Sequence, residues 1–153
     1  MKKICLALCL IGLFTSCDDE NDTVNSQEYL VFGHFYGMCV GEACVQTFKL
    51  TESQLLKDKE KDYSGENLHF VALEDEKFEL VKDLINDFPQ QLLTEKETFL
   101  GCPDCADGGG LFIQYSNNGN VRTWRIDQVK SNVPDYLHGF MDRVNAKIAL
   151  LLE

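Results

Sequence analysis

Hydrophobic and polar residues alternate in short runs along much of the chain, a pattern typical of strands. The run from Tyr29 to Cys39 is rich in aromatic and β-branched residues, and a second run covers Cys44 to Leu50. Only a short connection, residues 40–43, separates them, so we predict a β-hairpin. The runs Leu111 to Tyr115 and Val121 to Ile126 flank an Asn-Gly sequence, which supplies the positive φ angles of a hairpin turn and predicts a second hairpin.

Apolar residues at helical spacing predict two amphipathic helices. The first extends from about Glu74 to Phe88, where Pro89 ends it. The second follows Pro134, which a first helical turn tolerates, and repeats apolar residues at intervals of three and four as far as Leu151. Both patterns place charged residues between the apolar positions, so each helix is expected to pack one face on a core.

Two weaker signals complete the expected order of elements. Thr51 precedes Glu52 and a pair of leucines, which predicts a short polar helix through about Lys59, and residues 68–73 predict a strand. Because hairpins pair strands antiparallel, we predict an α+β fold: an antiparallel sheet of about four to five strands with two long amphipathic helices on one face. A single domain is expected over residues 29–153.

The first sixteen residues differ in composition from the rest of the chain. Lys2 and Lys3 precede an apolar run from Ile4 to Phe14, and Thr15, Ser16 and Cys17 follow. This is the layout of a signal peptide over residues 1–16. The apolar run has 11 residues, whereas a membrane-spanning helix takes about 20. The run is therefore expected to direct secretion and not to remain as a membrane span.

Small residues directly before a cysteine resemble the lipobox that the lipoprotein signal peptidase reads. We therefore expect cleavage before Cys17 and acylation of its sulfur, which would bind the protein to the lipid bilayer. At about 0.8 kcal/mol per buried methylene, two or more acyl chains hold a protein stably on a membrane. Residues 17–28 are then the lipidated cysteine and an acidic flexible tether, too polar to order itself.

The same region is similar to the start of small lipoproteins of Bacteroides-type bacteria. Phe14 stands where the usual lipobox has Leu, which is a relaxed form found in those bacteria, and residues 18–22 look like their acidic signal for export to the cell surface. A plain acidic linker is the alternative interpretation of residues 18–22. The motifs at residues 39–44 and 101–105 also look like those of such lipoproteins. The resemblance implies an outer-membrane lipoprotein, at the cell surface or facing the periplasm, and no particular activity.

Net charge excludes one class of partner. The chain has 14 Lys and Arg residues and 25 Asp and Glu residues, and without Lys2 and Lys3 the balance is 12 to 25, a net charge of −13. Nucleic-acid binding needs basic side chains that neutralise phosphates, so we expect no nucleic-acid partner.

Four cysteines remain after the expected cleavage: Cys39, Cys44, Cys102 and Cys105. Exported proteins usually have oxidised thiols, and an even count fits two disulfides. A long-range link such as Cys39 to Cys102 would constrain the unfolded chain by about 4 kcal/mol, against about 2 kcal/mol for a local one. Hairpin geometry nevertheless favours the local pairs, Cys39 with Cys44 and Cys102 with Cys105. Two alternatives are a four-thiolate zinc site and a redox-active pair at Cys102 and Cys105.

Other candidate residues give weak signals. His34, His69 and His138 lie in patterns more typical of packed or surface histidines than of ligands. The glycines at 108–110 indicate a tight turn, with an anion-binding cradle as the alternative, and Asp104 with Asp107 offers a calcium site without a regular ligand spacing.

The sequence contains no recognised catalytic or phosphate-binding motif. We therefore expect no cofactor, no resident metal and no catalytic residue. The predicted function is a membrane-anchored envelope or cell-surface binding or accessory module, with an envelope protein or a small ligand as its partner. The alternatives are a thiol-disulfide or metal-binding protein that uses Cys102 and Cys105, with Cys39 and Cys44, and a secreted inhibitor-like fold.

Overall fold

A computed structural model describes residues 28–153 of the chain. The expected signal peptide at 1–16, Cys17 and the tether as far as residue 27 lie outside the described residues. Within the described part, no helix is long and apolar enough to cross a membrane.

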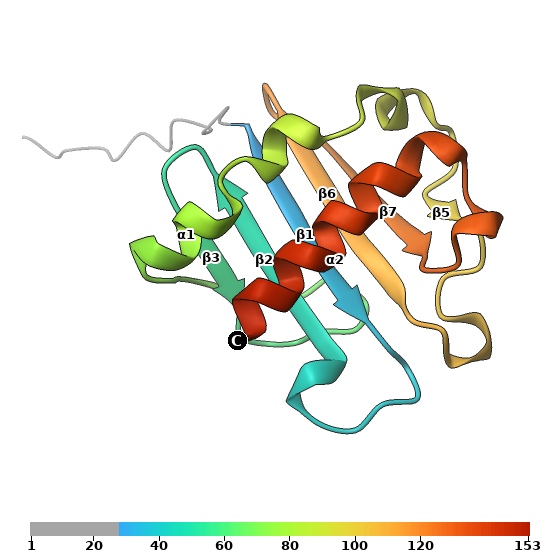
Figure 1. The fold of residues 1–153 in the computed structure, drawn as a ribbon, viewed down its shortest axis with the longest axis horizontal. Coiled ribbons are helices and arrows are strands. Elements are labelled where there is room, and N and C mark those ends of the chain that lie inside the picture. The colour runs from blue at the N-terminus through green and yellow to red at the C-terminus, as the bar shows by residue number, and fades with distance from the viewer. Residues whose placement is uncertain (1–27) are drawn as a thin grey trace, which may run out of the picture.

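The described residues form an α+β fold around one seven-stranded sheet (Figure 1). Its order is β4-β3-β2-β1-β6-β7-β5. The strands are β1 (Tyr29–Phe35), β2 (Val45–Thr51), β3 (Leu55–Asp58), β4 (Phe70–Ala72), β5 (Phe99–Leu100), β6 (Gly110–Asn117) and β7 (Asn120–Asp127). Neighbouring strands pair antiparallel except β5, which runs parallel to β7, so the sheet is mixed.

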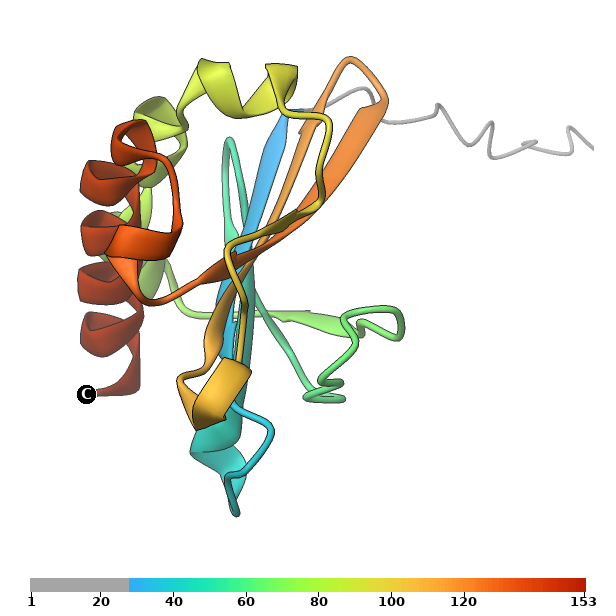
Figure 2. The same ribbon diagram turned by 90° about the vertical axis from the view of Figure 1, so that its right-hand side faces the viewer.

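Two α-helices cover one face of the sheet, as Figure 2 shows. They are α1 (Asp75–Val81) and α2 (His138–Leu152). Short 3-10 helices lie between the longer elements, at Glu42–Cys44, Leu84–Asp87, Gln90–Thr94, Cys105–Asp107, Lys130–Asn132 and Asp135–Leu137. Strand alternation explains the division of side chains: Leu111 and Ile113 pack under the helices, whereas Phe112 between them faces the opposite side.

Aromatic rings fill the centre of the core between the sheet and the helices. Phe88 stacks on Tyr115 with ring centroids 4.0 Å apart and meets Phe140 of α2 edge to face at 5.9 Å. The Trp124 ring of β7 lies 6.0 Å from Phe88 and is fully buried. Burial of these rings is the main stabilising contribution available to a sheet covered on this face by two helices.

A long connection covers part of the opposite face. We call residues 59–69, between β3 and β4, the strap (Figure 2). The strap is closed at its base, because the Lys59 N–H donates to the His69 carbonyl at 2.9 Å and buried Asp58 accepts the His69 N–H at 2.7 Å. Gly65 of the strap, at φ +73°, lies so close to Phe112 that a Cβ would be 2.3 Å from its ring. The strap is thus a compact loop with its ends together, a kind of loop that often carries function.

The register of β1 defines two ends of the sheet. Tyr29 pairs with Thr51 and Ser116, whereas Phe35 pairs with Val45 and Gly110. Over the seven residues of β1 the two ends are about 20 Å apart. The chain reaches the sheet at the Tyr29 end, and the two cysteine-containing connections lie beyond the Phe35 end, at the bottom of Figure 1.

Two predictions about local structure are wrong. Residues 51–59 do not form a helix: Thr51 ends β2, its Oγ1 accepts the Gln54 N–H at 3.1 Å, and the turn leads into β3. Leu55 is fully buried and pairs with Leu50, so packing across strands outweighs the helix-start signal. The sheet is also larger than four to five strands and not purely antiparallel, because β5, only two residues long, adds a parallel edge.

Only one of the two predicted long helices is long. α2 has 15 residues, whereas α1 has seven and ends at Val81, short of Phe88. The chain continues as a 3-10 helix to Asp87, and Phe88 takes an extended ψ of 122°. A residue before proline disfavours helical ψ, and the extended conformation lets the Phe88 ring reach the core. Both hairpins are confirmed, and a strand at 70–72 confirms the predicted one at 68–73 with tighter bounds.

Candidate functional site

The four cysteines of the described residues lie at the Phe35 end of the sheet in two local pairs. The Cα atoms of Cys39 and Cys44 are 5.5 Å apart, and those of Cys102 and Cys105 are 5.4 Å apart. Both separations are those of a disulfide. The structure therefore has the local pairing, and Cys39 is not linked to Cys102.

A carboxylate between the second pair of cysteines joins three segments. Asp104 Oδ2 accepts the Gly37 N–H at 2.7 Å and the Tyr63 hydroxyl at 2.8 Å. Its Oδ1 accepts the Gly109 N–H at 2.9 Å. Asp104 thus connects the segment after β1, the strap and the chain just before β6. We call residues 101–109 the Asp104 loop.

The protonation states at this junction favour the observed hydrogen bonds. Burial would raise the pKa of the Asp104 carboxyl group, but the three hydrogen bonds and the nearby charge of Arg125 outweigh it, so the pKa lies below its ordinary value. Burial, followed by the bond to Asp104, raises the pKa of the Tyr63 hydroxyl. At neutral pH the acceptor is therefore charged and the donor keeps its proton.

A second carboxylate holds the beginning of the Asp104 loop. Asp127, at the end of β7, is 3% exposed. It accepts the Cys102 N–H at 3.0 Å, the Val129 N–H at 2.8 Å and the Asn132 side-chain amide at 2.7 Å. Burial would raise the pKa of Asp127, but these hydrogen bonds outweigh it and lower the pKa from its ordinary value of 3.8.

Asp127 gives a testable dependence of stability on pH. Because its folded-state pKa is lowered, its contribution is present above pH 3.8 and is lost as the pH falls through the folded-state value. We expect Asp127→Asn to lower the free energy of unfolding by about 1–3 kcal/mol at neutral pH. The variant should also show a shallower loss of stability below about pH 4. Urea unfolding followed by Trp124 fluorescence at several pH values measures both effects.

A surface carboxylate provides the control for Asp127. Asp142 forms an exposed ion pair with Lys130 at 2.6 Å. Such pairs contribute at most about 1 kcal/mol, so Asp142→Asn should change little at any pH. An Asp127→Asn protein as stable as the unchanged protein at neutral pH would contradict the role given to Asp127.

Arg125 fixes the strap against the sheet. Its Nη1 donates to the carbonyl oxygens of Tyr63 at 2.8 Å and Ser64 at 3.1 Å. Its guanidinium carbon lies 3.7 Å from the centroid of the Phe35 ring and 4.8 Å from that of Tyr63. A cation between two rings and two carbonyl oxygens is held by both cation–π attraction and charge-assisted hydrogen bonds.

A cleft lies beside Arg125, on the sheet face opposite the helices. Its two adjoining hollows, of about 200 and 340 Å³, share Ser64, Phe99 and Arg125. Register explains the arrangement, because Arg125 pairs with Phe99 of β5 on one side and Phe112 of β6 on the other. Tyr63, Glu66 and Pro103 line one hollow, and Thr98, Phe112, Thr123 and Trp124 line the other. We call this the Phe99 cleft.

The Phe99 cleft has the chemistry of a recognition site. Phe99 is 62% exposed and Tyr63 is 43% exposed. Exposed rings of this kind pack against the apolar face of a ligand. The side chains of Ser64, Thr123 and Glu66 add hydroxyl and carboxylate groups for hydrogen bonds. A cleft with an apolar lining and a few polar groups is the common form of a ligand site.

Comparison with known proteins assigns no family to this chain. No family model matches the chain, and no curated protein matches it. The inference about function therefore depends on the sequence and on the geometry of the cleft.

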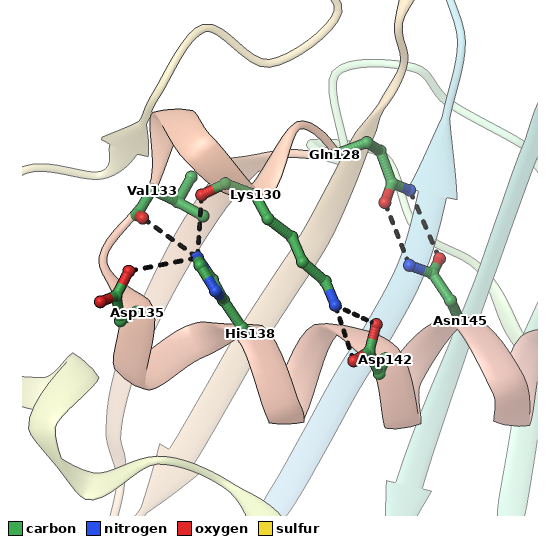
Figure 3. A network of polar contacts seen from close by, with 7 residues as sticks. All are labelled: Gln128, Lys130, Val133, Asp135, His138, Asp142 and Asn145. Carbon is green, nitrogen blue, oxygen red and sulfur yellow. Dashed lines mark hydrogen bonds and ion pairs between the residues drawn. The ribbon is translucent and has the colours of Figure 1, made fainter.

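Each of the three histidines has a backbone carbonyl or a carboxylate of the chain as its polar neighbour. His34 is half-buried, its Nε2 lies 3.0 Å from the Ala43 carbonyl, and burial lowers its pKa despite that contact. His69 lies 3.9 Å from Glu60 on the surface. Figure 3 shows His138 at the start of α2, where its Nε2 lies 2.8 Å from the Lys130 carbonyl and 3.3 Å from that of Val133.

The polar network of Figure 3 attaches the chain after β7 to α2. Lys130 pairs with Asp142, and the side-chain amides of Gln128 and Asn145 exchange hydrogen bonds at 3.4 and 3.1 Å. These exposed contacts supplement the packing of the apolar face of α2 on the core, which holds the helix on the sheet.

Of the glycines at 108–110, Gly108 and Gly109 connect the 3-10 helix Cys105–Asp107 to β6, and Gly110 is the first residue of that strand. Gly109, at φ +70°, lies against the Tyr36 ring, where a Cβ would be 2.1 Å from Cε1. Its N–H binds Asp104, so the carboxylate of the chain itself occupies the predicted anion-binding position. Both oxygens of Asp104 face donors, an arrangement that does not suit calcium. Among residues 28–153, no group of three His, Cys, Asp or Glu side chains is placed to hold a metal ion.

Sequence reasoning missed the residues of the cleft. Arg125 and Thr123 alternate with the apolar Trp124 and Ile126, which was a signal that this face of the strand is not packed under a helix. Phe99 gave no signal, since a two-residue strand has no periodicity. The Cys102 to Cys105 motif was singled out for its sulfur atoms, whereas the carboxylate between them makes the contacts.

Proposed function

We propose that the chain is a lipoprotein of the bacterial envelope, held to the outer membrane by acylated Cys17 and displayed at the cell surface. Its folded part acts as a binding module, and the Phe99 cleft is the binding site. The ligand, free or part of an envelope protein, presents an apolar ring face together with hydrogen-bonding groups.

The observation that carries this proposal is the position of the cleft relative to the N-terminal end of the sheet. The chain reaches the sheet at Tyr29, and the row of Phe99, Arg125 and Phe112 aligns with Gly33, toward the other end of β1. A tether that connects residue 17 to Tyr29 therefore joins the sheet at the end away from the cleft. Phe112, which lines the cleft, packs on the sheet face opposite α1 and α2, so neither helix covers the cleft.

The thiol-disulfide alternative has weaker support. Cys102 and Cys105 are exposed, which an exchange reaction needs. However, Cys105 begins a three-residue 3-10 helix, Cys105–Asp107, which Ala106 at φ 53° interrupts, and no α-helix starts here. The helix N-terminus that lowers a thiol pKa in redox enzymes is therefore missing beside this pair, and the adjacent Asp104 charge opposes thiolate formation.

Binding is tested by NMR titration of the mature chain, with Cys17→Ser to omit the lipid. The probes are small ring-containing molecules: monosaccharides, nucleosides and aromatic amino acids. We expect at least one probe to shift amide signals of the strap, β5 and β7, and Phe99→Ala to weaken that binding about tenfold. Val129→Ala, an equally simple truncation of a half-exposed side chain, is the control. No localised shift with any probe, or binding that Phe99→Ala leaves intact, would contradict the proposal.

A further inference from the structure

The loop between Cys102 and Cys105 has a backbone that side chains disfavour. Five non-glycine residues of the described part have positive φ, and three of them lie in the Asp104 loop: Asp104 at 63°, Ala106 at 53° and Asp107 at 60°. Residues with a Cβ avoid this region because the Cβ approaches the backbone. Such a conformation persists where the surroundings impose it. Here the cross-link between positions 102 and 105 encloses Asp104, and Ala106 and Asp107 are the next two residues after it.

The same loop supplies one wall of the Phe99 cleft. Pro103 lines the cleft directly, and Tyr63 lines it from the strap. The Tyr63 hydroxyl is held by Asp104, and the rest of Tyr63 is held by Arg125 and by an edge-on contact with Phe35 at 5.2 Å. Asp104 is thus one of three residues that position this wall of the cleft, together with Arg125 and Phe35.

The two pairs of cysteines differ in accessibility. Cys102 and Cys105 are both exposed, whereas in the other pair Cys39 is exposed and Cys44, the residue before β2, is 8% exposed. The Cys39–Cys44 connection is also held by hydrogen bonds from the Tyr36 N–H to the Cys44 carbonyl at 3.0 Å and from Gly37 to Asp104. The 102–105 pair thus has two exposed cysteines and the 39–44 pair only one, so we expect a reductant in solution to reduce the 102–105 pair first.

We propose that the Cys102–Cys105 disulfide is a redox switch for the Phe99 cleft. A dithiol, small or carried by a protein, reduces it. One thiolate of the dithiol attacks a sulfur of the pair and displaces the other as a thiolate, and the second thiol of the dithiol then closes its own disulfide. In total one S–S bond breaks and one forms, and two electrons and two protons pass to Cys102 and Cys105.

Reduction lets the Asp104 loop relax to negative φ and withdraws the carboxylate from Tyr63. The tip of the strap then loses its bond to the Asp104 loop, and the cleft wall formed by Tyr63 and Pro103 opens. The oxidised form presents the Phe99 cleft described above, and the reduced form presents a cleft whose Tyr63 and Pro103 wall is displaced. The biological meaning of the switch rests on the proposed binding function of the cleft, whereas the switch itself is a property of the loop and the strap.

Hydrogen exchange of the mature chain with Cys17→Ser tests the switch without any ligand. Under limiting dithiothreitol we expect alkylation at Cys102 and Cys105 before Cys39 and Cys44. Amide exchange in residues 62–67 and at Gly37 and Gly109 should then rise about tenfold. The double variant Cys102→Ser with Cys105→Ser should show the fast exchange without reductant. The matched double variant at Cys39 and Cys44 should keep the strap protected while it is oxidised.

Tyr63→Phe distinguishes the proposed connection from general loosening. This variant keeps the disulfide and the ring but lacks the hydroxyl that binds Asp104. In the oxidised state, the strap amides of this variant should exchange as fast as those of the reduced unchanged protein. Reduction of the variant should then raise their exchange rate by less than about twofold. Strap exchange unchanged by reduction, or reduction of Cys39–Cys44 first, would overturn the switch. Because no ligand is used, failure here and failure of the probe titration are separate results.

Discussion

Phe88→Ala is expected to lower the free energy of unfolding by about 3–5 kcal/mol. Phe88 is 4% exposed, and its ring contacts those of Tyr115, Trp124 and Phe140. Truncation to Ala removes the burial of the ring and leaves a cavity among three aromatic side chains that cannot collapse into it. Domains of this size are stable by roughly 5–15 kcal/mol, so the loss is a large fraction of the total. Trp124, the single tryptophan of the chain, reports the transition in urea.

The control for Phe88 is the same change at an exposed position. Phe99 is 62% exposed, so Phe99→Ala should change stability by about 0.5 kcal/mol or less. If Phe88→Ala does not accumulate as a folded protein, Phe88→Leu, with a smaller expected loss, replaces it in the measurement. A loss below about 1 kcal/mol for Phe88→Ala would show that this ring is not a central part of the core.

Cys17→Ala is expected to remove the protein from the outer-membrane fraction entirely. The substitution deletes the sulfur that we propose to be acylated, and with it the two or more chains whose buried methylenes would each contribute about 0.8 kcal/mol to membrane binding. We expect a precursor that retains residues 1–16, visible as a larger band in gels of density-gradient fractions. A Cys17→Ala protein that is processed and stays in the outer membrane would contradict acylation at this residue.

Cys9→Ala is the matched control for the anchor. Cys9 lies inside the apolar run and is expected to leave with the signal peptide. Alanine keeps that run apolar, so processing and fractionation should match those of the unchanged protein. A difference between the two alanine variants therefore reports on position 17 itself and not on the loss of any cysteine.

Elements with long-range periodicity were predictable from the sequence. The two hairpins and α2 follow from alternation, from the Asn-Gly turn and from six apolar positions at helical spacing, and the structure confirms them. The α+β class follows from the same elements. The signals at Thr51 and before Pro89 misled because they are local: pairing with β2 made a strand of residues 55–58, and the approach of Phe88 to the core shortened α1.

The candidate site was predictable only in part. The local cysteine pairs follow from the hairpin and from the short spacing between positions 102 and 105. The contacts of Asp104 with Gly37 and Tyr63 join residues 67 and 41 positions apart, and no sequence pattern carries such information. Phe99 and Arg125 meet through a parallel pairing of two residues, which leaves no periodic trace.

Mass spectrometry of the N-terminal peptide from protein purified out of membranes tests the proposed acylation of Cys17. We expect a chain that begins at Cys17 and carries diacylglycerol on that sulfur, with or without a third acyl chain on the new amino group. A mature chain that begins at another residue, or an unmodified Cys17 at its start, would contradict the lipoprotein assignment.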